Sequence, residues 1–180
     1  MYIKALIISL LCLFVLASSN EETMTWNETR KLTWSDFKSS PNPKSDAVAL
    51  TASGITFGYS IKTSGKRIVD FNTTVESHFY PKKSWYLKNK ADNYILGHEQ
   101  LHFDLTELYS RMFRQQLTTL RVNQNLRAQL KNLHTSINEE LDETQKKYDT
   151  QTNHSRNPEM QKRWETFVKT ELKKLDLYKS

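Results

Sequence analysis

The residues best suited to carry out chemistry stand together near the middle of the chain, where residues 98–102 read HEQLH. Two histidines four positions apart on a helix lie about 40° apart around its axis, so the imidazoles of His98 and His102 can reach one metal ion. Glu99 lies about 100° from His98, beside such an ion, where it can take a proton from a water molecule. The pattern predicts His98 and His102 as zinc ligands and Glu99 as a catalytic base.

A zinc site of this kind needs a third protein ligand, because catalytic zinc is usually held by three side chains with a fourth position left for water. Asp104 and Glu107 follow on the same predicted helix but point away from the histidine face. We favour His154, because a residue in the short connection between the second and third predicted helices can swing back toward the first. Asp149, in the same connection, is the next candidate. The other histidines outside the HExxH pattern are His78, on the polar face of a predicted strand, and His134, which we expect to pack between helices.

Three helices are expected after residue 90, where the apolar residues take up a helical period. The first runs from about residue 91 to 120, the second from about 125 to 148, and the third begins at Pro158 with Asn157 as its cap. The apolar stripe of the second helix is Leu126, Leu130, Leu133, Ile137, Leu141 and Tyr148. On the first helix, Leu101, Leu105, Leu108 and Met112 should face the core, while Gln100, Asp104, Glu107 and Arg111 should face solvent. The HExxH residues would then lie between core and cleft.

Residues 48–80 alternate between apolar and polar side chains, as is typical of strands. The apolar positions are Ile55, Phe57, Tyr59 and Ile61 before a break at 63–66, and Val69, Phe71, Val75 and Phe79 after it. Period two on both sides of a glycine-containing break predicts an antiparallel β-hairpin, to which residues 49–53 could add a third strand. The predicted fold class is α+β, with an N-terminal antiparallel hairpin or small sheet packed on a C-terminal three-helix region.

The N-terminal segment has the pattern of an export signal. After one positive charge, an uncharged apolar run over residues 5–16 leads to the small residues 17–19. Because this run is too short to span a bilayer comfortably, we expect a signal peptide over residues 1–19 that is removed before Asn20. An uncleaved membrane anchor is the alternative. The product should be secreted or periplasmic, and the only cysteine, Cys12, would leave with the signal.

Composition limits the remaining possibilities. The chain has 180 residues, of which 37% are hydrophobic and 26% charged, as in ordinary globular domains. A single cysteine excludes an intramolecular disulfide framework and a cysteine-based zinc finger. The formal net charge is +6, but both signs are mixed along the helices, so we expect no nucleic-acid partner. Residues 20–180 should form one domain, mainly strand and loop over 20–90 and mainly helix over 91–180.

Four stretches of the chain resemble the bacterial family called domain of unknown function 922, a family of predicted secreted zinc-dependent proteases. They are residues 96–104 (LGHEQLHFD), 33–37 (TWSDF), 46–55 and 148–155 (YDTQTNHS), with Gln161 and Trp164 beyond the last. The HExxH pattern alone is not specific to this family, but its combination with the later TNHS is fairly specific. The resemblance implies metallopeptidase chemistry for His98, Glu99 and His102, and it favours His154 as the third ligand.

The leading hypothesis is therefore a secreted zinc-dependent peptidase with a single zincin-like domain and a peptide or protein substrate. An exposed strand such as residues 55–61 could hold the peptide by strand addition. Tyr148 or His78 could donate a hydrogen bond to the oxyanion. The alternatives are an inactive extracytoplasmic module that binds a metal or a partner, and a basic helical protein of the cell envelope.

Overall fold

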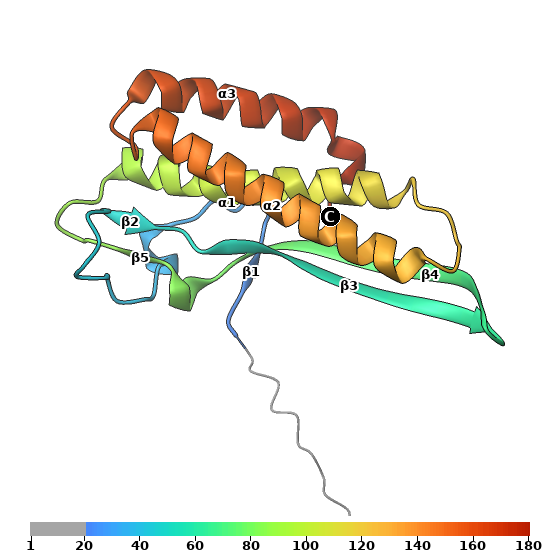
Figure 1. Ribbon diagram of the computed structural model, residues 1–180. Coiled ribbons are helices and arrows are strands. Elements are labelled where there is room, and N and C mark those ends of the chain that lie inside the picture. The colour runs from blue at the N-terminus through green and yellow to red at the C-terminus, as the bar shows by residue number, and fades with distance from the viewer. Residues whose placement is uncertain (1–20) are drawn as a thin grey trace, which may run out of the picture.

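The computed structural model describes residues 21–180, which form an α+β fold of two small antiparallel sheets and three long helices (Figure 1). The strands are β1 (Met24–Thr25), β2 (Ala49–Leu50), β3 (Ser53–Ser64), β4 (Arg67–Phe79) and β5 (Trp85–Tyr86). The helices are α1 (Asn93–Leu117), α2 (Leu126–Thr152) and α3 (Pro158–Lys174). The expected signal peptide over residues 1–19 lies outside the described residues. Among residues 21–180, no helix has both the length and the apolar character needed to cross a bilayer.

The predicted hairpin is confirmed, with β3 and β4 paired antiparallel and joined by a turn in which Gly65 has a left-handed φ of 59°. The third strand of this sheet is β1, which pairs with the end of β4, whereas β2 pairs with β5 in a separate sheet. The expected inward position of Val69 is wrong. The register shifts beside Lys62, so that Val69 is 45% exposed and Ile68 packs against the core instead. An extra residue in one strand reverses which side chains face inward beyond it.

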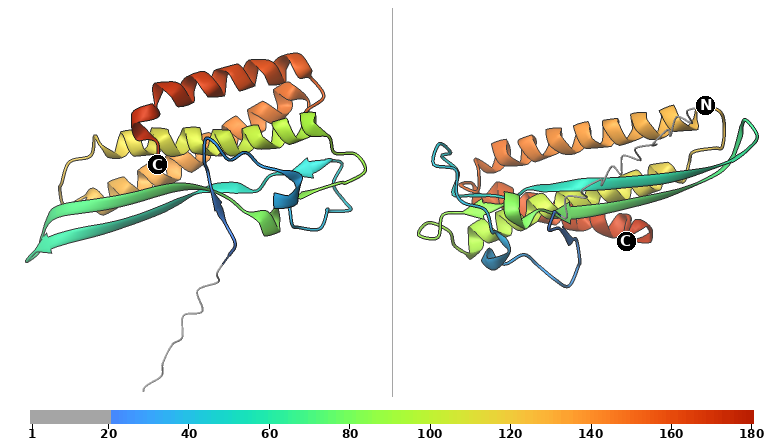
Figure 2. Two further views of the ribbon diagram at one scale, coloured as in Figure 1. Left: turned by 180° about the vertical axis from the view of Figure 1, so that it is seen from behind. Right: turned by 90° about the horizontal axis from the view of Figure 1, so that it is seen from below.

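Helix α1 lies between the β3–β4 hairpin and α3, and α2 crosses it (Figure 1). Helix α2 runs obliquely, so its two halves belong to different parts of the core (Figure 2). One cluster joins the hairpin, the end of α1 and the start of α2 through Phe57, Val75, Phe113, Leu126, Leu130 and Ile137. Another joins the start of α1, the end of α2 and α3 through Leu101, Leu105, Leu141, Tyr148, Trp164 and Val168. The predicted apolar stripe of the second helix therefore faces the core.

The remaining side of α1 is covered by the N-terminal segment, whose Trp26, Leu32 and Phe37 pack with Phe79 and Phe103. This enclosure overturns the expectation that Glu107 and Arg111 face solvent, since only 0% and 2% of their surface is exposed. Glu107 accepts hydrogen bonds from Ser77 Oγ at 2.6 Å and from Arg111 Nε at 2.8 Å. A helix with neighbours on every side buries polar residues as well as apolar ones, provided that they find partners.

The ends of α2 and α3 decide which residues reach α1. Helix α3 begins as predicted, with the Asn157 side chain accepting a hydrogen bond from the backbone N–H of Met160. Helix α2 continues to Thr152 and ends where Asn153 adopts the left-handed conformation that commonly closes helices. Asp149 therefore lies in the last turns of α2 and not in the connection where the sequence placed it.

Candidate metal centre

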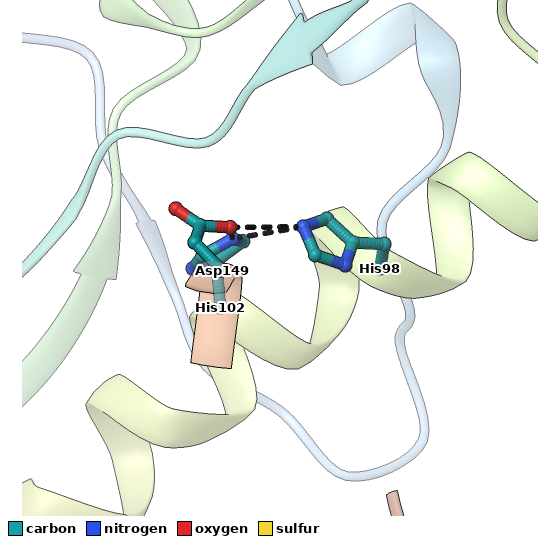
Figure 3. Close-up of side chains that lie close together, drawn as sticks. All are labelled: His98, His102 and Asp149. Carbon is teal, nitrogen blue, oxygen red and sulfur yellow. Dashed lines mark hydrogen bonds and ion pairs between the residues drawn. The ribbon is translucent and has the colours of Figure 1, made fainter. Parts of the chain in front are cut away.

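His98 and His102 lie one turn apart near the start of α1, as the HExxH spacing predicted. The helix begins with Asp92 as its cap, whose carboxylate accepts a hydrogen bond from the N–H of Ile95 at 2.8 Å. The Nε2 atoms of the two imidazoles are 3.2 Å apart, and their rings are nearly perpendicular (Figure 3). Both rings thus direct Nε2 to one point beside the helix.

Asp149 completes this arrangement from α2. Its Oδ1 atom is 3.2 Å from Nε2 of His98 and 3.1 Å from Nε2 of His102 (Figure 3). Ligand atoms about 2.0–2.1 Å from a tetrahedral zinc ion lie about 3.3–3.4 Å from one another, close to the separations found here. His98, His102 and Asp149 are thus a group that could hold a metal ion.

The electrostatics of this group favour a positive charge at its centre. Burial raises the pKa of Asp149, but the hydrogen bonds and charges of His102 and His98 outweigh it and hold that pKa well below its usual range. Burial lowers the pKa of His102, yet the facing Asp149 and nearby Glu99 raise it overall. A carboxylate oxygen and two imidazole nitrogens that converge repel one another unless a proton or a metal ion lies between them.

The group is largely buried but not closed. The side chains of His98 and His102 are 5% and 13% exposed, while that of Asp149 is 33% exposed, so solvent reaches the site beside α2. Glu99 is buried on α1 next to the histidines, and its Oε2 atom has no hydrogen-bond partner among the described residues. A buried carboxylate oxygen without a partner is costly, and such groups often serve a reaction.

Two side chains of α2 hold the histidine rings. Tyr148 stacks on His98 with ring centroids 4.6 Å apart, and its hydroxyl donates to the backbone carbonyl of His98 at 3.3 Å. Burial raises the pKa of Tyr148 far above its usual value, so the hydroxyl stays neutral and engaged with the helix. The sequence reasoning missed Gln145, which contacts the ring of His102. The spacing of Gln145, Tyr148, Asp149 and Thr152 on one face of a longer second helix was the signal for it.

The other candidate histidines lie outside this group. The His154 side chain is 69% exposed, and although its Nδ1 atom is 3.8 Å from Asp149 Oδ1, it does not belong to the group whose ligand atoms all lie within 4.8 Å of one another. The geometry therefore favours Asp149, the second candidate, over His154. His78 forms a hydrogen bond with Thr56 at 2.7 Å and pairs with Glu76. His134 of α2 stacks on Phe113 of α1, as expected for a residue packed between helices, and also contacts Phe57 of β3.

Comparison with known proteins agrees with the resemblance found in the sequence. A model of the family described as bacterial protein of unknown function (DUF922) matches residues 24–155, which include β1, the hairpin, α1, α2 and all the residues of the candidate metal centre. Searches of curated proteins and of solved structures found no match. Since the family model covers well over half of the chain, the protein belongs to the bacterial DUF922 family.

Proposed function

We propose that this protein is an exported zinc-dependent peptidase. The observation that carries the proposal is the convergence of His98, His102 and Asp149 on one point, at the separations of a tetrahedral site, beside the glutamate of an HExxH helix. When bound, zinc would polarise the scissile carbonyl and lower the pKa of water at the site. Two imidazoles, one carboxylate and an open side are the donor set that suits this chemistry.

Glu99 supplies the proton transfer. It lies one residue after His98 on α1, and its Oε2 atom is free to accept a proton from water. The same carboxyl group can then return that proton to the leaving amine.

The substrate would be a peptide in extended conformation, bound along β3. This strand is at the edge of its sheet, so one side of its backbone is open to pairing. The start of β3 lies close to the site, because Ser53 Oγ is 2.7 Å from Thr106 Oγ1, one turn after His102 on α1. A peptide added to β3 would thus approach the metal centre with its backbone aligned by the strand.

The test combines metal analysis with hydrolysis of a broad peptide set by the purified exported protein. We expect one zinc per chain, and cleavage that Glu99→Gln lowers by about 100-fold or more with zinc retained. Glu139→Gln, at an exposed glutamate of α2, is the matched control and should leave the rate unchanged. Bound zinc without hydrolysis would support the inactive module, and iron in place of zinc would point to oxygen chemistry at a two-histidine, one-carboxylate site.

A further inference from the structure

Gln145 bridges α2 and the metal centre through both ends of its amide. Its Oε1 atom contacts Nδ1 of His102, and its Nε2 atom donates to the backbone carbonyl of the same residue at 2.9 Å. Gln145 is thus bonded twice to one residue of α1, once to the ring and once to the helix backbone.

The direction of these hydrogen bonds follows from the carbonyl. A carbonyl oxygen only accepts, so the amide atom facing it must be the NH₂ group. The reversed amide would place Oε1 of Gln145 against the oxygen of His102, two acceptors at 2.9 Å. The oxygen of Gln145 therefore faces Nδ1 of His102, and it can be satisfied only if Nδ1 carries a proton.

A polar network outside the metal group supports the same orientation. Thr106 Oγ1 donates to the carbonyl of His102 at 3.2 Å and lies 3.5 Å from Nε2 of Gln145. Ser53, at the start of β3, then reaches Thr106 Oγ1 at 2.7 Å. Contacts with α1 thus fix the orientation of the Gln145 amide, and Ser53 of β3 in turn holds Thr106 in place.

We propose that Gln145 is a positioning residue that keeps the proton of His102 on Nδ1 and so presents Nε2 as the metal-binding nitrogen; this rests on the metal centre of the proposed function. A neutral imidazole with a proton on Nδ1 has its lone pair on Nε2, the atom that faces Asp149 and His98. Metal-bound histidines commonly donate their second nitrogen in this way, and loss of the partner typically costs about 10–100-fold in affinity.

The role is specific to one of the two histidines. Nδ1 of His98 is buried and has no hydrogen-bond partner among the described residues, and its ring is held by stacking on Tyr148. Loss of the Gln145 amide should therefore affect the ring of His102 and leave that of His98 in place.

The experiment compares Gln145→Met with Gln151→Met in the exported protein. Gln151 is a matched control on the same helix, since its Oε1 accepts a hydrogen bond from the ring N–H of Trp164 at 2.9 Å, away from the metal group. We expect zinc affinity, measured by chelator competition, to fall about 10–100-fold in Gln145→Met and to change little in Gln151→Met. Circular dichroism and thermal melting show whether both variants fold.

Ring ¹⁵N spectra of the zinc-loaded protein give a readout that a purely structural role would not change. In the wild type, His102 should carry its proton on Nδ1 and bind zinc through Nε2, and in Gln145→Met the Nδ1 proton should exchange faster with solvent. Zinc bound through Nδ1 of His102, or equal affinities in the two variants, would overturn the proposal. Zinc binding with these effects but without hydrolysis would refute the peptidase while leaving Gln145 in its role, and a wild type that binds no zinc would refute both.

Discussion

We expect the largest loss of folding stability when the buried ion pairs of Glu107 are broken. Glu107 is fully buried, and its carboxylate pairs with Arg111 at 2.8 Å and Arg114 at 3.2 Å while accepting from Ser77. Glu107→Gln keeps the size of the side chain but leaves a buried guanidinium charge without its partner. Breaking a buried pair in this way costs about 3–5 kcal/mol.

The lower end of that range applies here, because both guanidinium groups keep other acceptors. Arg114 still donates to the carbonyls of Val75 and Tyr178, and Arg111 to that of Leu172. We therefore expect a loss of about 3 kcal/mol, which for a chain of this size lowers the melting temperature by about 6–12 °C.

Thermal and urea unfolding of Glu107→Gln and Glu159→Gln measure this difference directly. Glu159 pairs with Arg163 at the same four-residue spacing, but both side chains are about seven-tenths exposed, and such a pair contributes about 0.3–0.5 kcal/mol. If the two substitutions destabilise the protein equally, the Glu107 cluster does not stabilise the packing of α1 as we infer.

Three further outcomes are expected. Tyr148→Phe should lower stability by about 1 kcal/mol, through loss of the hydroxyl bond to the backbone of His98, and leave zinc affinity unchanged because the stacked ring remains; a large loss of zinc would mean that the hydroxyl acts in the site. Burial raises the pKa of Asp36, but hydrogen bonds from Arg30 and Thr33 lower it overall, so the stability that this carboxylate contributes is present above its unfolded pKa and is lost as pH falls through the lower folded value. Asp36→Asn should thus be less stable than the wild type near neutral pH, and urea midpoints of the two should converge in acid. Intact mass of the exported protein should correspond to a chain that begins near Asn20, and a mass that includes residues 1–19 would indicate an anchored protein.

The elements of the fold could be predicted where periodicity alone determines them. The alternation around Phe57 and the apolar stripe that includes Leu130 and Ile137 identified the hairpin and α2, because one face of each packs on the core. The bulge at Val69 was missed because Ile68 and Val69 are both apolar, so the alternation alone does not decide which of them faces the core; the pairing with β3 decides it. Nor could the burial of Glu107 be predicted, because it depends on α1 having neighbours on every side.

The candidate site could be predicted only where it depends on local spacing and not on contacts between elements. His98, Glu99 and His102 follow from spacing within one helix, which sequence specifies directly. Asp149 depends on where α2 ends, because a helix that ends at residue 148 leaves both Asp149 and His154 in the connection, whereas the observed helix continues to Thr152. Gln145 can be recognised as part of the site only when its contacts with His102 on α1 are known, because a polar residue on a helix usually faces solvent.

The most direct test of the central claim is the zinc dissociation constant of the wild type, Asp149→Ala and His154→Ala, measured by chelator competition on the purified proteins. We expect the wild type to bind one zinc tightly, Asp149→Ala to lose most of its affinity, and His154→Ala to bind like the wild type, because Oδ1 of Asp149 converges with the histidines while the His154 side chain is mostly exposed. A wild type that binds no zinc would contradict the metal centre itself. Zinc lost in His154→Ala but retained in Asp149→Ala would contradict its assigned ligands.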